Sequence, residues 1–313
     1  MAEQLTMLVL GANGFAGAHL ATAAREAGLR VAATSRRGSE DAPACDLLDP
    51  ASIAACLRAV QPDLVVNAAG SASVGSSWQR PAQAFAANAT AVLNLLEAVA
   101  AEAPTAHVLC LSSADVYGGR EPEELPLGEE LQPRPLTPYG AGKAAMEALC
   151  GQYARGRGLR IAVARIFNLV GPGQSAEFAL PGFARRIAAA ELDGEAGVEL
   201  ALGNPAAVRD FVDVREGASA LVELSRRQLC GTYNLCSGRG TTIAALVEEL
   251  GRQARVPVTA RTEPTLQRPA DPPALVGDPR RLREQAGFAA ATPLAQSLAD
   301  LLDSWRAGPS APA

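Results

Sequence analysis

Histidine is scarce in this chain of 313 residues, with His19 and His107 as its two copies. A single chain therefore cannot hold a metal ion on three histidines. Cysteine is present without the C-x-x-C spacing of zinc or dithiol motifs. The six cysteines are Cys45, Cys56, Cys110, Cys150, Cys230 and Cys236. We expect no metal site and no dense disulfide framework, and we interpret the thiols as small core residues in a reducing compartment.

An excess of positive charge is also lacking, with 28 Lys and Arg against 33 Asp and Glu, a net charge of −5. This balance argues against a broad nucleic-acid-binding face. No run of about 18 apolar residues is present, and residues 1–6 lack the basic and apolar segments of a signal peptide. Because 48% of the residues are hydrophobic, the chain can build a large core. We expect a folded, cytoplasmic protein with neither membrane nor nucleic acid as a partner.

Short, continuously apolar runs alternate with segments of helical length in the first half of the chain. Continuous apolarity indicates strands covered on both faces, as in a doubly wound parallel sheet of the Rossmann type. The predicted strands lie at 7–10, 31–33, 64–66, 107–111 and 161–164. The predicted helices lie at 18–27, 52–60, 83–101, 140–156, 214–227, 241–254 and 293–306.

The alternation breaks after Gly171-Pro172-Gly173. The first 170 residues therefore predict the α/β part of the fold, and the rest of the chain is more mixed. The short tail 307–313 has little to pack and is expected to be disordered.

Three glycines follow the first predicted strand and open the first helix, in the order Gly11-Ala-Asn-Gly14-Phe-Ala-Gly17. Glycines at such a turn let the backbone approach a pyrophosphate, and the helix N-terminus supplies free N–H groups. The spacing is G-x-x-G-x-x-G, which differs from the usual G-x-G-x-x-G fingerprint. Its position at the first strand predicts a dinucleotide site.

The end of the second strand carries Ser35-Arg36-Arg37 and no acidic residue. An acid there would bind the adenosine ribose 2′-hydroxyl and repel a 2′-phosphate. Two guanidinium groups favour a phosphate, so we predict NADPH as the preferred cofactor, with NADH possible; a solvated arginine pair is the alternative. Asp46 either contacts the adenine or caps the next helix.

Tyr139 and Lys143 stand four residues apart, hence on one face of a helix. A cation close to a phenol is expected to lower its pKa from about 10 and so to assist proton exchange. Ser113 follows an apolar strand, which would place it at the carboxyl edge of a parallel sheet. An exposed helix pair is the alternative for Tyr139 and Lys143, but the order of glycine loop, serine and Tyr-x-x-x-Lys favours a catalytic set.

These motifs resemble those of the extended short-chain dehydrogenases/reductases, a family of NAD(P)-dependent nucleotide-sugar epimerases, dehydratases and reductases, over residues 5–306. The resemblance implies that Ser113, Tyr139 and Lys143 are catalytic, and that the protein is a homodimer formed through helices near 83–101 and 139–156. The resemblance implies a smaller α/β C-terminal substrate domain of residues 171–207 and 238–306, beside a first domain of residues 1–170 and 208–237. It also implies a set of cofactor contacts along the first domain. These are Gly11, Asn13, Gly14, Phe15, Gly17, Ser35, Arg36, Arg37, Asp46, Leu47, Ala68, Ala69, Gly70, Asn88, Tyr139, Lys143 and Ile166.

Further segments resemble the members of this family that reduce GDP-4-keto-6-deoxy-D-mannose. They include Ser73–Trp78, Arg165–Asn168, Val208–Asp213 and the proline-rich stretch after Arg268. The resemblance implies a nucleotide-diphosphate sugar as the partner, bound by Ser73, Ser113, Asp115, Asn168, Arg209 and Arg268. For Arg209 an ion pair with Asp210 or Asp213 is the alternative, and for Arg268 a surface position.

The residues beside Ser113 bear on which reaction is expected. A 4,6-dehydratase needs an acid or base there; Ala114 can be neither, and Asp115 does not decide between dehydratase and reductase. Both histidines precede Tyr139, which disfavours a 3,5-epimerase/reductase that uses a later histidine. We expect NADPH-dependent reduction of a C4 ketone, giving GDP-D-rhamnose. A 4-epimerase, a dehydratase and a non-catalytic NADP-sensing protein remain as alternatives.

Overall fold

The computed structural model describes residues 4–267 and 270–308, and it confirms the predicted α/β architecture. Six parallel strands form the main sheet in the order β2-β1-β3-β4-β5-β9. Their bounds are β1 (Thr6–Leu10), β2 (Arg30–Thr34), β3 (Leu64–Asn67), β4 (His107–Ser113), β5 (Arg160–Ile166) and β9 (Gly231–Leu235). Strand β2 lies on one side of β1, and the next strand, β3, lies on the other. Because the strand order reverses there, a ligand crevice is expected beyond the carboxyl ends of β1 and β3.

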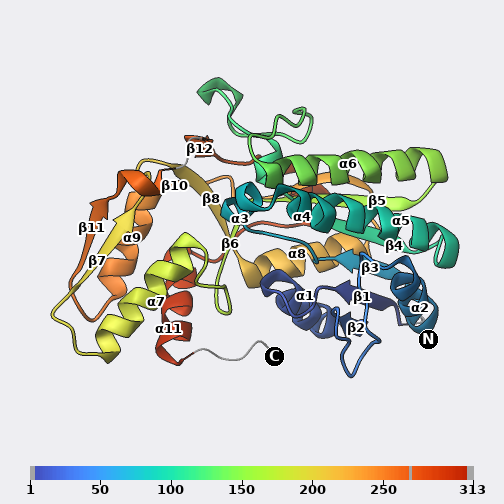
Figure 1. Ribbon diagram of the computed structural model, residues 1–313, viewed down its shortest axis with the longest axis horizontal. Helices are drawn as coiled ribbons and strands as arrows, with labels where there is room; N and C mark the ends of the chain where they lie inside the picture. The colour runs from blue at the N-terminus through green and yellow to red at the C-terminus, as the bar shows by residue number, and fades with distance from the viewer. Residues whose placement is uncertain (1–3, 268–269, 309–313) are drawn as a thin grey trace.

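Helices cover both faces of this sheet, which explains why its strands are continuously apolar (Figure 1). One face packs against α1 (Phe15–Glu26) and α8 (Val214–Arg226). The other packs against α2 (Pro50–Val60), α5 (Ala91–Glu102) and α6 (Pro138–Arg157).

The ends of α6 follow from its sequence. The hydroxyl of Thr137 accepts a hydrogen bond from the Gly140 amide at the first turn, and Gly158, at a φ of 71°, ends the helix.

The predicted helix at 83–101 lies within a longer helical stretch, 81–102. It consists of α4 (Pro81–Phe85), a π-helical turn η1 (Ala86–Thr90) and α5, and it follows the short α3 (Val74–Gln79). By length and composition alone this stretch could cross a membrane, and half of its most apolar window is buried inside the protein. The core helices of soluble proteins pass the same test.

The remaining elements form a smaller α/β part, drawn on the left of Figure 1. One sheet contains β6 (Asn168–Val170), β8 (Val208–Asp213), β10 (Gly240–Thr242) and β12 (Ala274–Leu275), and a separate pair contains β7 (Val198–Leu202) and β11 (Val258–Thr262). The helices are α7 (Ala179–Leu192), α9 (Ile243–Gln253) and α11 (Leu294–Arg306), which bury a common apolar cluster. The shorter segments elsewhere are α10 (Arg280–Ala286), η2 (Ala114–Val116), η3 (Pro122–Glu124) and η4 (Pro264–Leu266).

The predicted division into two domains remains a prediction. Within the segment 208–237 that was assigned to the first domain, β9 joins the main sheet beside β5 and α8 covers that sheet. The strand β8 pairs instead with β6, β10 and β12 of the smaller part. Of the tail predicted from residue 307, residues 309–313 lie outside the described residues.

Candidate active site

The glycine loop joins β1 to α1 and lies against the chain that follows β3. A Cβ built on Gly11, at a φ of +78°, would stand 2.7 Å from the amide nitrogen of Ala69. A Cβ on Gly17 would stand 2.2 Å from the carbonyl oxygen of Gly11. Only glycine tolerates such approaches. Gly14 caps α1 without a side-chain hydrogen bond, which leaves the first N–H groups of the helix available for an anion.

A second glycine forms a small cradle near the predicted catalytic lysine. A Cβ on Gly70 would stand 2.6 Å from Oδ1 of Asn88 and 3.7 Å from Nζ of Lys143. The buried Asn88 donates through Nδ2 to the carbonyl oxygen of Ser71, while its Oδ1 has no partner among the described residues. The unpartnered Oδ1 of Asn88 is a buried acceptor that lies near the Lys143 ammonium and the exposed Gly70. Such a group fits the hydrogen-bond donors of a dinucleotide.

The residues expected around the adenosine lie beyond the ends of β1 and β2. The side-chain amide of Asn13 donates to the hydroxyl of Ser35 at 3.2 Å. Arg36 and Arg37 are exposed, and neither forms an ion pair within residues 4–267 and 270–308. Asp46 is half-buried and accepts a hydrogen bond from the Leu48 amide.

The alternative role for Asp46, as the cap of the next helix, is excluded, because Asp49 caps α2 through the Ala51 amide. Leu47 is buried beside Asp46, and Ala68 and Ala69 are half-buried at the end of β3.

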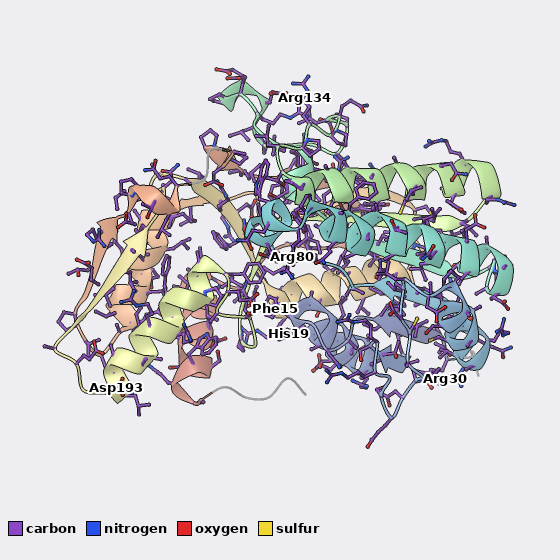
Figure 2. The ribbon with its side chains drawn as sticks, viewed as in Figure 1. Phe15, His19, Arg30, Arg80, Arg134 and Asp193 are labelled. Carbon is purple, nitrogen blue, oxygen red and sulfur yellow. The ribbon has the colours of Figure 1, made fainter. Side chains whose placement is uncertain are left out.

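Figure 2 shows Phe15, the first residue of α1, at the end of that helix nearest the smaller part. Ile166 ends β5, paired with Ser113 of β4. The predicted dinucleotide residues therefore gather at the carboxyl edge of the main sheet, where a dinucleotide is expected.

The catalytic candidates come together from β4 and α6. Tyr139 is in the first turn of α6, and its backbone N–H donates to Oγ of Ser77. Nζ of Lys143 lies 5.9 Å from the centre of the Tyr139 ring. Ser113 ends β4, and its hydroxyl donates to Oδ2 of Asp115 at 2.9 Å. All three candidates are less than a tenth exposed.

The pKa of Tyr139 is raised above its usual value, chiefly because the phenol is buried, and also because the negative charge of Asp115 is close. A hydrogen bond with Ser113 acts in the opposite direction on this pKa. The expectation that Lys143 lowers the pKa of Tyr139 is therefore wrong for the protein alone. The reason is geometric: Nζ of Lys143 donates to the carbonyl oxygen of Leu111 at 2.7 Å, at the end of β4.

Burial lowers the pKa of Lys143 itself to about 8. Lys143 is also the single lysine of the chain, in which every other basic side chain is arginine or one of the two histidines. The single compact, titratable ammonium of the chain therefore lies in the candidate active site.

Two of the residues expected to hold the substrate, Ser113 and Asp115, lie at the end of β4 and in η2, and the other described ones lie on β6, on β8 and just before α3. Nδ2 of Asn168 donates to the carbonyl oxygen of Asp210 at 3.0 Å. Nη2 of Arg209 pairs with Oδ1 of Asp271 at 2.6 Å, a partner that differs from the two considered from the sequence. Ser73 caps α3 by accepting the Ser76 amide. Arg268 lies outside the described residues.

Sequence reasoning missed an ion pair between α6 and the main sheet. Glu147, one turn after Lys143 on α6, pairs with Arg165 of β5 and accepts the hydroxyl of Ser112. The four-residue spacing of Tyr139, Lys143 and Glu147 was the available signal. From the sequence, Asp210 was expected only as a partner for Arg209. Its buried carboxylate instead accepts hydrogen bonds from Ser237 and Gly238, which follow β9, and from Gly277, which follows β12.

A family model described as the NAD dependent epimerase/dehydratase family matches residues 7–236, about three quarters of the chain. The chain belongs to this family. Members of the family that are similar to this chain include NAD(P)-dependent nucleotide-sugar reductases, epimerases and dehydrogenases. The protein is an enzyme of that kind.

Similar family members differ in their reactions. GDP-6-deoxy-D-mannose reductase of Pseudomonas aeruginosa is 35% identical over 300 residues, covering 96% of each chain. GDP-6-deoxy-D-talose 4-dehydrogenase of Aggregatibacter actinomycetemcomitans is 28% identical over 90% of this chain and 92% of that protein. UDP-glucose 4-epimerase of Azospirillum brasilense is 29% identical over 90% of this chain and 86% of that protein.

Solved structures agree with the fold. RMD from Pseudomonas aeruginosa, complexed with NADPH, superposes with a TM-score of 0.87 at 33% identity, covering 97% of this chain and 99% of that chain. UDP-glucose 4-epimerase from Thermus thermophilus, complexed with NAD, gives a TM-score of 0.85 at 27% identity, covering 97% and 100%. These structures support binding of an NAD(P) cofactor by this family member.

Proposed function

We propose that this enzyme uses NADPH to reduce the C4 ketone of a nucleotide 4-keto-6-deoxy sugar, converting GDP-4-keto-6-deoxy-D-mannose to GDP-D-rhamnose. The observation that carries the proposal is that the buried side chains of Ser113 and Tyr139 lie within hydrogen-bonding reach of each other at the carboxyl edge of the sheet. The similarity to the Pseudomonas aeruginosa reductase over nearly the whole chain supports the choice of substrate.

Reduction of a ketone places negative charge on its oxygen, and two donors can stabilise that charge. Bound NADPH is the source of the hydride. Tyr139, a buried phenol that is protonated at neutral pH like any tyrosine, gives its proton to the C4 oxygen as a general acid. Ser113 turns its hydroxyl from Asp115 to the same oxygen, while the Asp115 amide continues to donate to Oγ of Ser113. Lys143, close to Gly70 and Asn88, binds the nicotinamide ribose in this proposal.

The same geometry supports reduction over dehydration. A dehydratase must remove a proton from C5 and protonate the leaving hydroxyl, which needs a further acid and base. Ala114 supplies neither, while Asp115 by itself does not decide between the two reactions. A 4-epimerase remains the second candidate, because several similar proteins carry that name and Ser113, Tyr139 and Lys143 would suffice for it.

The preference for NADPH rests on Arg36 and Arg37, which are exposed at the end of β2 where no acidic residue stands. A guanidinium binds phosphate oxygens in pairs. For the sugar nucleotide, Asn168 and Arg209 lie on the neighbouring strands β6 and β8, and the diphosphate would compete with Asp271 for the Arg209 guanidinium. We also propose a homodimer formed through α5 and α6, since half of the most apolar window of the stretch 81–102 is not buried within one chain.

The test is the loss of NADPH with GDP-4-keto-6-deoxy-D-mannose, generated in place by a GDP-mannose 4,6-dehydratase. NADH and dTDP-4-keto-6-deoxyglucose are run alongside. Rapid loss of NADPH with the GDP sugar alone supports reductase, cofactor and nucleotide together. No loss with either sugar contradicts the reductase, and interconversion of UDP-glucose and UDP-galactose by protein that retains its own cofactor would establish the epimerase.

A further inference from the structure

His19 connects the cofactor helix α1 to the segment that leads into the smaller part of the protein. Its Nε2 lies 3.0 Å from the carbonyl oxygen of Pro172, 153 positions later in the chain. A carbonyl oxygen only accepts, so Nε2 carries the hydrogen in this bond. The ring of Phe15 packs edge-on against His19 at 5.5 Å and 84°, and Figure 2 shows both rings at this end of α1.

The Pro172 carbonyl belongs to a loop that packs against α8 and bonds to β6. A Cβ on Gly171 would stand 2.7 Å from Cγ1 of Val214, so this glycine packs closely against the start of α8. Gly173 adopts a φ of +85°, which favours glycine. Nε2 of Gln174 donates to the carbonyl oxygen of Leu169 at 3.1 Å. The loop is thus connected through Gln174 to β6.

Both ends of this connection reach residues of the proposed site. On one side, His19 lies five residues after Gly14, whose helix start faces the expected pyrophosphate. On the other side, Gln174 is tied to Leu169, which follows Asn168 in β6, the strand expected to contact the sugar nucleotide. Neither His19 nor Pro172 belongs to the expected contacts with cofactor or substrate.

We propose that His19 is a positioning residue that couples cofactor binding at the glycine loop to sugar-nucleotide binding at β6. This inference rests on the proposed function, because it assumes that both ligands bind this chain. An anion that orders the start of α1 fixes His19, and His19 in turn fixes the Pro172 loop and Asn168. Coupling of this kind is reciprocal, so each ligand raises the affinity for the other by the same factor.

The experiment measures binding by calorimetry, with NADPH and GDP as the probes, each titrated alone and in the presence of the other. The unaltered protein is compared with His19→Leu, which removes the donor, and with His19→Gln, whose Nε2 can donate to the same carbonyl. Thr22→Ala, a change on the exposed side of α1, serves as the matched control, since the Thr22 hydroxyl bonds only within its helix.

We expect each ligand to tighten the other about fivefold or more in the unaltered protein. His19→Leu should lose most of that factor with little change in the affinity for NADPH alone, and His19→Gln and Thr22→Ala should keep it. Thermal unfolding of each variant reports whether the fold is intact. A merely structural role would weaken NADPH binding equally with and without GDP, and would overturn the inference.

The outcomes also separate this inference from the proposed function. Binding of GDP without any coupling in the unaltered protein contradicts the role of His19 alone. Binding of UDP or dTDP in place of GDP contradicts the guanine assignment, and the coupling is then measured with that nucleotide. If none of the three nucleotides binds, the proposed substrate class and the role of His19 both fail.

Discussion

Arg165 of β5 and Glu147 of α6 form a buried, bidentate ion pair that joins the helix of Tyr139 and Lys143 to the main sheet. Nη2 of Arg165 lies 2.8 Å from Oε2 of Glu147, Nε lies within 3.2 Å of both carboxylate oxygens, and each side chain is at most 9% exposed. The same guanidinium stacks on the ring of Tyr117 at 4.7 Å. The pair fixes α6, and with it Tyr139, against the central strands.

Removing one partner of this pair should destabilise the fold strongly. Glu147→Gln or Arg165→Met leaves a buried charge unpaired, which costs about 3–5 kcal/mol in the free energy of unfolding. The double substitution should cost less than the sum, as measured by urea denaturation. Arg252→Met, which breaks the exposed pair with Glu249, should change stability by less than about 1 kcal/mol. Equal effects at the two pairs would contradict the assignment.

Tyr139→Phe should remove the proton donor and little else. We expect turnover to fall by about 10²–10⁴-fold, the usual contribution of a general acid, with the affinity for NADPH unchanged. Tyr153→Phe is the matched control, because Tyr153 lies on the same helix and bonds Glu97 away from the site. Steady-state rates and NADPH titrations check both variants, and unimpaired turnover in Tyr139→Phe would remove Tyr139 from this role.

Lys143 should titrate near pH 8 in the protein without ligands. Burial disfavours the ammonium, so its pKa lies below the ordinary 10.5, and the folded protein releases this proton before the unfolded chain does. The free energy of unfolding should therefore rise with pH between about 8 and 10.5 through this group, while NADPH affinity falls as the ammonium is lost.

As Lys143 is the single lysine, selective isotopic labelling of lysine gives one side-chain signal in an NMR titration. Tyr139→Phe should leave the midpoint in place, because burial is the main cause of the shift. A midpoint at or above 10.5 would show that the ammonium is not desolvated.

Arg36 and Arg37 should determine the choice of cofactor. Replacing both by Ala removes the guanidinium groups expected at the 2′-phosphate, so the KM for NADPH should rise about tenfold or more while that for NADH changes little. Arg252→Ala, an exposed arginine of α9, is the control for lost surface charge. Equal KM values for NADPH and NADH in the unaltered enzyme would argue for a solvated arginine pair.

Arg209 should act on the sugar nucleotide and not on the cofactor. Arg209→Gln is expected to raise the KM for the sugar nucleotide about tenfold, because a charged hydrogen-bonding partner of the diphosphate is lost. The KM for NADPH should stay the same. Arg261→Gln, which removes an exposed pair with Glu199, controls for general loss of charge. An unchanged KM for the sugar nucleotide would leave Arg209 as a partner of Asp271 alone.

The amino-acid sequence by itself determined the main sheet and the identity of the chemical groups. Apolar runs such as 7–10 and 107–111 are buried on both faces only when helices cover both sides of the sheet. The order of strands and helices along the chain then puts four residues at the carboxyl edge of the sheet: Gly11, Ser113, Tyr139 and Lys143. Local spacing carries this information, so no long-range contact had to be known.

Tertiary structure decided what the side chains do once they meet. Whether Lys143 faces the phenol of Tyr139 or the carbonyl of Leu111, and whether Arg209 pairs with Asp210 or Asp271, depends on segments far apart in sequence. The contact between His19 and Pro172 spans 153 positions. Hydrogen bonds and burial depend steeply on distance and on the surrounding atoms, and neither is set by spacing along the chain.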